Sequence, residues 1–246
     1  MSIKRNLHII MPMAGEGSRF VSEGWMTPKP LIEIGGIPLF KHALSSIEGG
    51  LFPIKYSFIV RQEHINRYSI DASIRNFIPD AEIFSVGHTT RGAVETCLLA
   101  APSLCEEDAV LVMDCDLEFR CQDFNKEVEN VLSKDNSTQG GLLVSFRSTD
   151  PRYSYAATDG RTNRVIRVAE KEPISYHALC GAYFFSSSRC FLNAARRLMS
   201  DGPGGKKEYY VSLLYTYLLD DGQEVYLFEA EEYRSYGTPE ELSEYL

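Results

Sequence analysis

Apolar runs alternate with amphipathic segments through the first half of the chain. Runs typical of buried strands occupy residues 7–13, 56–60, 81–86 and 109–113. Between them, apolar residues recur at helical spacing over 38–47, 63–77 and 92–101. Strands alternating with helices in this way predict a mostly parallel sheet, covered by helices on both faces and built with right-handed crossovers.

The second half follows a different pattern. Strands are expected at 141–146, 180–185 and 224–230, and a hairpin at 155–159 and 164–169, which turns at Gly160. Helices are expected at 187–199 and 209–219, and a last one opens at Thr238. Ser187 and Thr238 are suited to be N-cap residues, and Glu241 can complete a capping box with Thr238. The predicted fold is a single α/β domain with a Rossmann-like, mixed but mostly parallel sheet flanked by helices.

Composition and charge narrow the classes of function. The chain has 246 residues and a net charge of −9, which argues against a nucleic-acid backbone as a partner. No run approaches the roughly 18 apolar residues of a membrane-spanning helix, and no signal peptide precedes the first strand. We therefore expect a cytoplasmic protein with no membrane partner. The cysteines form no CxxC pair, which makes a zinc site improbable and reduced thiols the expectation; they are residues 97, 105, 115, 121, 180 and 190.

Two short stretches after the first strand carry candidate chemistry. They are PMAGEGSRF, residues 12–20, and TPKPL, residues 27–31. Glycines let backbone N–H groups turn toward one point, and such a nest suits phosphate. Arg19 adds a bidentate fork and Lys29 a compact charge, which the flanking prolines help to aim. Because ligands of open parallel sheets bind at the carboxyl ends of the strands, we expect this group to face a phosphate there.

These stretches match neither of the common phosphate loops. A Rossmann fingerprint needs a third glycine where Phe20 stands, and no GK[ST] of a Walker loop follows. The combination of AGEGSRF with TPKPL instead resembles the sugar-1-phosphate nucleotidylyltransferases, the NDP-sugar pyrophosphorylases of the nucleotidyltransferase superfamily. Further segments similar to that family extend the resemblance over most of the chain; they are TTRGA at 89–93, VMDCD at 112–116, EK at 170–171, CGAYF at 180–184 and YGTPE at 236–240.

The resemblance implies a Mg²⁺-dependent enzyme that joins an NTP to a sugar 1-phosphate and releases pyrophosphate. It implies a nucleotide-binding half over about 1–118 and an acceptor-binding half over about 119–246. Arg19 and Lys29 are the implied catalytic cations. The implied nucleotide-binding residues are Met13, Ala14, Gly15, Gly17, Ser18 and Gly92. The implied acceptor-binding residues are Glu170, Lys171 and Gly181.

The implied magnesium ligands are Asp116 and, second, Asp114. Asp116 stands where the family carries its metal aspartate, just beyond an apolar strand. Many relatives carry a second metal-binding Asp or Asn two residues before the closing glycine, whereas this chain has Ser235. A hydroxyl is a weaker Mg²⁺ ligand than a carboxylate. Asp114 ranks first as its replacement, since it lies two residues from Asp116; Glu231 and Glu232 are the other candidates.

Two other readings stay open from the sequence. A cytidylyltransferase acting on phosphocholine or another non-sugar phosphate keeps the chemistry and changes the acceptor. The short chain, the PMAG form of the loop and the missing late Asp are compatible with this reading. Aromatic side chains around a quaternary ammonium group would favour phosphocholine, but the sequence does not place Trp25 or Tyr153 at the site. A nucleotide-sugar sensor without catalysis is the third reading, and only Ser235 favours it. A homo-oligomer is possible.

Overall fold

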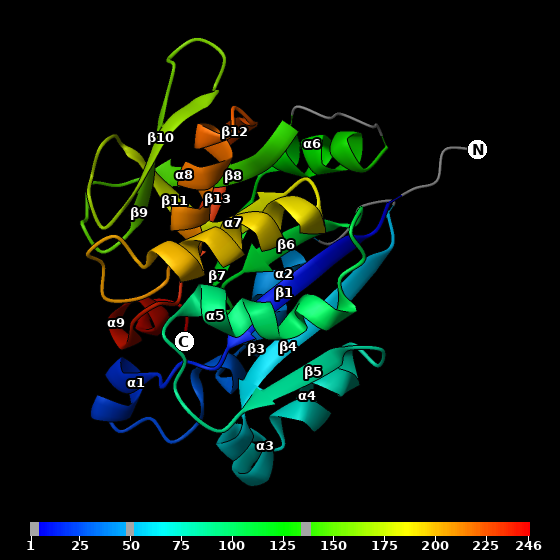
Figure 1. Cartoon of the computed structure of the whole chain (residues 1–246). Coiled ribbons are helices and arrows are strands. Elements are labelled where there is room, and N and C mark those ends of the chain that lie inside the picture. The colour runs from blue at the N-terminus through cyan, green and yellow to red at the C-terminus, as the bar shows by residue number, and fades with distance from the viewer. Residues whose placement is uncertain (1–4, 48–51, 134–138) are drawn as a thin grey trace.

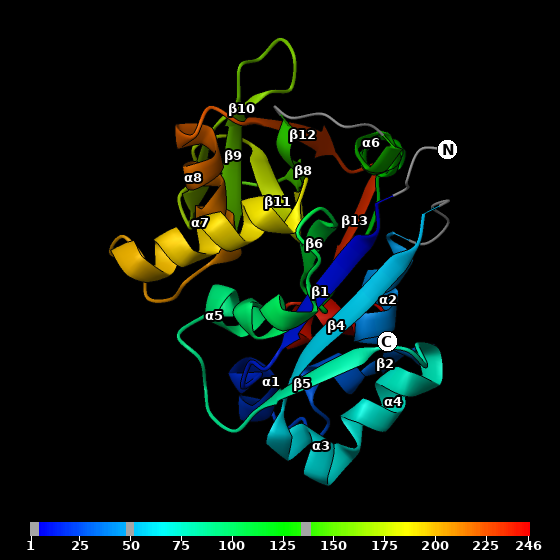
Figure 2. The same cartoon turned by 45° about the vertical axis from the view of Figure 1, so that its right-hand side comes forward.

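A mixed nine-stranded sheet forms the centre of the molecule (Figures 1 and 2). The computed structural model describes residues 5–47, 52–133 and 139–246. Seven strands follow one another across the sheet in the order β10-β9-β11-β6-β1-β4-β5, and β8 joins β11 to β12. Within the described residues, no helix is long and apolar enough to cross a membrane. The α/β sheet predicted from the sequence is confirmed.

The first half of the chain supplies the parallel part of the sheet. Its strands are β1 (Leu7–Met13), β4 (Ile54–Arg61), β5 (Glu82–Val86) and β6 (Ala109–Met113). β1 lies in the middle, parallel to both β4 and β6. Every residue of β6 is buried, as expected for a strand covered on both faces. The carboxyl ends of β1 and β6 therefore meet at one edge of the sheet.

The second half adds an antiparallel part centred on β11. Its strands are β8 (Gln139–Arg147), β9 (Ser154–Thr158), β10 (Val165–Glu170), β11 (His177–Phe185) and β12 (Glu224–Glu229). β11 runs antiparallel to β6, β8 and β9, so it joins the two halves into one sheet. The predicted hairpin is formed by β9 and β10.

Helices cover both faces of the sheet. One core, which includes Leu7 and Ile9 of β1, contains residues of α2 (Leu39–Ser45), α4 (Ile70–Phe77) and α6 (Gln122–Ser133). The other core, on the opposite side, includes α5 (Ala93–Cys97), α7 (Ser188–Asp201) and α8 (Leu214–Asp220). The Ser187 hydroxyl accepts from the Cys190 N–H at the start of α7, which confirms the predicted cap.

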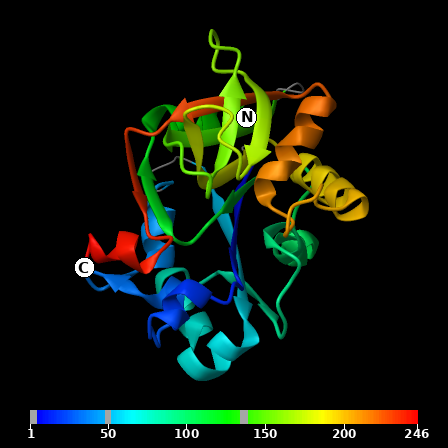
Figure 3. The ribbon, with the colours of Figure 1, turned by 90° about the vertical axis from the view of Figure 1, so that its left-hand side faces the viewer.

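A third, small core ties the end of the chain to its beginning. It contains Phe20, Ile32, Leu39, Tyr236 and Leu242. Phe20 lies in α1 (Ser18–Ser22) and Leu242 in α9 (Pro239–Ser243), and Ile34 of β2 (Glu33–Ile34) packs against this core. The other short segments of the fold are η1 (Lys29–Leu31), β3 (Ile37–Pro38), β7 (Leu117–Arg120) and β13 (Glu232–Ser235). Figure 3 shows α9 beside the first segments of the chain. The predicted capping box of Thr238 and Glu241 opens α9.

Three predicted helices differ from the structure in extent. The segment 63–77 forms two helices, α3 (Gln62–Tyr68) and α4, because Ser69 adopts a left-handed φ of 50° between them. The segment 92–101 continues from α5 as a 3₁₀ helix, η2 (Leu98–Ser103). The segment 209–219 becomes helical only at η3 (Val211–Leu213), because the Tyr209 backbone N–H instead bonds the Arg91 carbonyl.

Candidate active site

The loop after β1 places both predicted cations at the carboxyl edge of the sheet. Gly17 has a left-handed φ of 61° and caps α1, which carries Arg19. Lys29 begins the 3₁₀ turn η1, and Pro28 and Pro30 on either side restrict its backbone. The Arg19 side chain is exposed and makes no hydrogen bond or ion pair with any residue that the structure describes. Arg19 is thus available to a ligand.

Lys29 meets the aspartates that follow β6. Its Nζ forms a close ion pair with Asp116 Oδ2 and donates to the Gly237 carbonyl at 3.1 Å. The side chains of Lys29 and Asp116 are only 16% and 28% exposed. Asp116 therefore already holds a cation at this point, although that cation is the protein's own ammonium group.

Two cavities meet at Lys29, Asp114 and Asp116. The larger, about 660 Å³, lies over the glycine loop. Among the residues that line it are Met13, Gly15, Glu16, Gly17, Trp25, Arg61, His64 and Tyr68. The smaller, about 300 Å³, lies over the antiparallel part of the sheet. Among the residues that line it are Arg19, Arg152, Tyr153, Glu170, Lys171, Gly181, Tyr210, Ser235 and Glu241.

Glu170 and Lys171 have different environments although they are neighbours. Glu170 is 4% exposed, and its Oε2 accepts from the hydroxyls of Ser154 and Ser212. Its Oε1 makes no hydrogen bond with a described residue. Lys171 has a left-handed φ of 56°, rare for a residue with a side chain, and its Nζ donates to the Tyr210 hydroxyl at 2.6 Å. A carboxylate oxygen and an ammonium group thus face the smaller cavity.

Gly181 allows β11 to pass close to Asp114. Its φ is 90°, and a Cβ there would lie 2.7 Å from Asp114 Oδ2 and 2.9 Å from Leu117 Cδ2. The pairing of β11 with β8 also shifts between Leu179 and Tyr183, as in a β-bulge. Burial, reinforced by the negative charge of Asp116, raises the pKa of Asp114 to about 8.

Substituting Gly181 with alanine is expected to lower the free energy of unfolding by roughly 2–4 kcal/mol. Alanine is strained at this positive φ, and its methyl group would clash with the Asp114 carboxylate. Gly205 is a matched control, since its φ is 80° and nothing lies within 4 Å of its Cβ position. Gly205→Ala should cost only about 1 kcal/mol. Urea unfolding of the two variants measures the difference, and equal losses would show that the contact with Asp114 is unimportant.

Three predicted nucleotide-binding residues do not line either of these cavities. Ala14 is buried and its carbonyl accepts from Arg61, while Ser18 is exposed at the start of α1. Gly92 lies against the chain itself, because a Cβ there would be 2.5 Å from the Tyr209 backbone nitrogen. Its neighbour Ala93 does line the smaller cavity.

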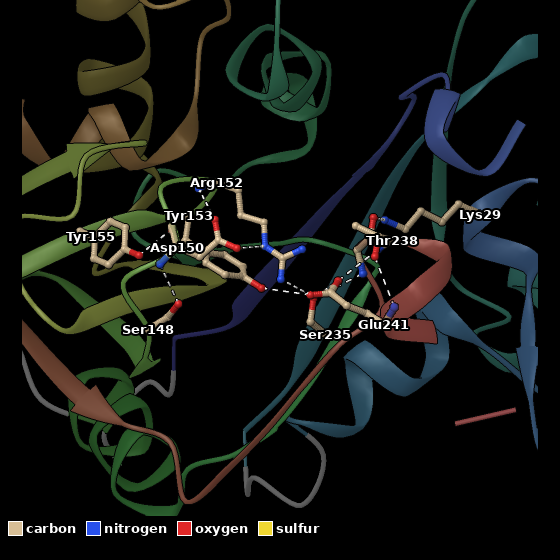
Figure 4. Close-up of polar contacts among 10 residues, drawn as sticks. Lys29, Ser148, Asp150, Arg152, Tyr153, Tyr155, Ser235, Thr238 and Glu241 are labelled. Atoms are coloured by element: carbon tan, nitrogen blue, oxygen red, sulfur yellow. Dashed lines mark hydrogen bonds and ion pairs between the residues drawn. The ribbon is translucent and has the colours of Figure 1, made fainter. Parts of the chain in front are cut away.

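A polar network that the sequence motifs do not predict lies beside Lys29 (Figure 4). Glu241 Oε1 accepts from Arg152 Nη2 and from the Tyr153 hydroxyl, at 3.2 Å in the second case. Its Oε2 accepts from the Ser235 hydroxyl at 2.8 Å and from the Thr238 N–H at 3.1 Å. The capping box pointed to Glu241, but no sequence signal indicated Arg152.

The oxygen donors at the junction fit a Mg²⁺ ion that also binds phosphate and water. Asp116 and Asp114 provide carboxylates there, and one or two protein carboxylates are usual for Mg²⁺. Among the described residues there is no preformed group of three or more His, Cys, Asp or Glu ligands. The structure does not bring Glu231 and Glu232 to this junction, since both pair with Arg120 and neither lines the two cavities.

Comparisons with known proteins identify the family and the fold of the chain. A family model described as nucleotidyl transferase matches residues 8–245. Among curated proteins no match is found. The chain is similar in structure to a nucleoside-diphosphate-sugar pyrophosphorylase from Vibrio cholerae RC9, with a TM-score of 0.80 and 25% identity over 97% of this chain and 99% of that one.

Two further solved structures share the fold at lower identity. A putative glucose-1-phosphate thymidylyltransferase from Bacillus anthracis has a TM-score of 0.73 and 20% identity, over 97% of this chain and 93% of that one. The inositol-1-phosphate CTP transferase from T. maritima has a TM-score of 0.72 and 14% identity, over 98% of this chain and 92% of that one.

Proposed function

The chain belongs to the nucleotidyl transferase family, and from this premise we propose that it transfers a nucleotidyl group from an NTP to a sugar 1-phosphate, releasing pyrophosphate. One observation carries the proposal. Two cavities of unequal size meet at a lysine and two aspartates, as a reaction between two phosphorylated substrates requires. The family generally uses a divalent metal ion, and Mg²⁺ is the proposed cofactor.

We assign the larger cavity to the NTP and the smaller to the acceptor. An NTP is the larger molecule, and this cavity contains the glycine loop, whose N–H groups suit the triphosphate. Apart from the shared aspartates, Lys29 and a few first-half residues, the smaller cavity is built from residues beyond 150. This distribution supports the proposed division into a nucleotide half, about 1–118, and an acceptor half, about 119–246.

The proposed reaction is an in-line displacement at the α-phosphorus. An oxygen of the acceptor phosphate forms the new bond, and the bond to the β-phosphate oxygen breaks. The acceptor phosphate is already ionised near neutral pH, so the site needs no general base. Lys29, where the two cavities meet, and Arg19, which lines the smaller cavity and would approach from the acceptor side, neutralise the α-phosphate and the leaving pyrophosphate. Glu170 and Lys171 hold the acceptor. Asp116 and Asp114 would hold Mg²⁺, and the ion would supply further charge neutralisation on the phosphates.

The lining of the smaller cavity favours a sugar over phosphocholine. A quaternary ammonium group needs free aromatic faces. Here Lys171 Nζ lies 4.5 Å from the ring centroid of Tyr210, and the Arg152 guanidinium carbon lies 4.7 Å from that of Tyr153. The protein's own cations thus already occupy one face of each of these two rings. Glu170, whose Oε1 accepts no hydrogen bond from a described residue, is instead suited to accept hydrogen bonds from sugar hydroxyls.

A substrate panel tests the proposed function. Mg²⁺-dependent pyrophosphate release is measured with ATP, CTP, GTP, UTP and dTTP, each against hexose 1-phosphates, phosphocholine and glycerol phosphate. We expect release with a hexose 1-phosphate and with one preferred base. Release only with phosphocholine or glycerol phosphate would make the chain a non-sugar transferase, and nucleotide binding without any release would support the sensor.

A further inference from the structure

We propose that Arg152 binds the phosphate of the acceptor, on the side of the site where this chain has Ser235 in place of a metal-binding carboxylate. The inference rests on the proposed function and names a residue that the family motifs found in the sequence do not include. It makes Arg152 a substrate-binding residue, with Glu241 as the residue that positions it.

Arg152 belongs to the smaller cavity, together with Arg19 and Lys29. It lies in the loop between β8 and β9, and its side chain extends toward Glu241 and Lys29 (Figure 4). The side chain is 37% exposed, so it is neither buried in the fold nor free in solvent. A guanidinium group in this position can contact a ligand that enters the smaller cavity.

Three contacts fix the guanidinium group. Its Nε lies 3.1 Å from Asp150 Oδ2, its Nη2 donates to Glu241 Oε1, and its carbon lies 4.7 Å from the Tyr153 ring centroid. Its Nη1 makes no hydrogen bond with a residue that the structure describes. A pre-oriented guanidinium with N–H groups to spare is the arrangement that binds phosphate at little entropic cost.

Glu241 links this guanidinium to the reacting centre. A Cβ on Gly237 would lie 3.1 Å from Glu241 Oε2 and 3.8 Å from Asp116 Oδ2, so the two carboxylates flank Gly237. The carbonyl of the same glycine accepts from Lys29. Glu241 thereby holds Arg152 on the same side of the site as Lys29 and Asp116. The attacking phosphate must lie beside these residues.

The residue at position 235 explains why an arginine is useful here. The Ser235 hydroxyl donates to Glu241, and a hydroxyl is a weak Mg²⁺ ligand. Two other cations of the smaller cavity are engaged by the protein, since Lys171 donates to the Tyr210 hydroxyl and Lys29 pairs with Asp116. The Arg152 charge reduces repulsion between the acceptor phosphate and the NTP without a metal ligand at 235. Arg152 keeps its protons throughout, since the bonds that form and break are those of the phosphoryl groups.

Acceptor affinity measured without chemistry tests the inference. The acceptor found by the substrate panel is titrated calorimetrically into enzyme saturated with Mg²⁺ and a non-reactive α,β-methylene analogue of the preferred NTP. We expect Arg152→Gln to weaken acceptor binding about 10–100-fold and to change analogue binding less than about twofold, since it removes a charge-assisted contact to one substrate only. Arg152→Lys should lose less, because it keeps the charge but not the planar fork.

Arg197 offers a matched control. It also stacks on a tyrosine at 4.7 Å, pairs with an aspartate, and is exposed on α7 outside the cavity. Arg197→Gln should leave both affinities unchanged. Wild-type acceptor affinity in Arg152→Gln, or in Arg152→Lys should the glutamine variant unfold, would overturn the inference while the proposed function stands. No pyrophosphate release by the wild-type enzyme with any pair would instead overturn the proposed function.

Discussion

Replacing Lys29 with alanine is expected to lower turnover about 10²–10³-fold, with little change in the thermal midpoint of unfolding. Lys29 lies where the two cavities meet, and its ammonium group can neutralise charge that develops on the leaving pyrophosphate. Such an interaction is made mainly in the transition state, so kcat and kcat/KM should fall together. The fold should survive, because Asp116 is 28% exposed and water can solvate it once the lysine is gone.

Lys126 provides the control for this prediction. It pairs with Asp123 on the exposed face of α6 and lines neither cavity. Lys126→Ala should keep the turnover of the wild type. Steady-state pyrophosphate release and a thermal melt of both variants make the comparison. Turnover of Lys29→Ala within about threefold of the wild type would remove Lys29 from the catalytic machinery.

The parallel part of the fold could be predicted because its signals are local. β1 and β6 have the bounds expected from the sequence, since each is an apolar run that ends at a glycine loop or an aspartate. The position of the candidate site then follows from a general rule about the carboxyl ends of parallel strands. The nearness of Gly15, Lys29 and Asp116 is therefore predictable from the sequence alone.

Segments governed by distant contacts could not be predicted in the same way. β7 and β13 have mixed charged and apolar residues, and they form a strand pair only because they meet across more than a hundred residues of chain. The sequence gives no signal for the helix break at Ser69 either, because serine does not normally favour a left-handed φ.

Glu241 illustrates the same limit within the site. Its capping-box role with Thr238 is a short-range pattern and was predicted. Its contacts with Arg152 and Tyr153 span 89 and 88 positions, and nothing local encodes them. The short motifs of the site can therefore be recognised in the sequence, whereas the long-range contacts of Glu241 cannot.

Replacing Asp116 with asparagine is expected to lower turnover about 10³-fold and to weaken the response to Mg²⁺, because an amide is a poorer ligand for a hard cation than a carboxylate. The variant also leaves Lys29 without its ion-pair partner, so structural integrity needs a separate check. Binding of Mn²⁺ in the presence of the NTP, followed by electron paramagnetic resonance, reports on the metal independently of turnover. We expect the Mn²⁺ dissociation constant to rise at least about tenfold, since the variant loses a charged ligand.

Asp114→Asn and Asp123→Asn complete this test. Asp114 is the second proposed ligand, and in the absence of metal its burial raises its pKa to about 8. If Asp114 binds the metal ion, Asp114→Asn should also weaken Mn²⁺ binding. The loss should be smaller than for Asp116→Asn, because the wild-type Asp116 carboxylate already binds a cation, the Lys29 ammonium group. Asp123 is exposed on α6 and should have no effect when changed. Wild-type Mn²⁺ affinity in Asp114→Asn would leave Asp116 as the sole proposed ligand, whereas wild-type affinity in Asp116→Asn would refute this metal site, because these two aspartates are the only carboxylates assigned to it.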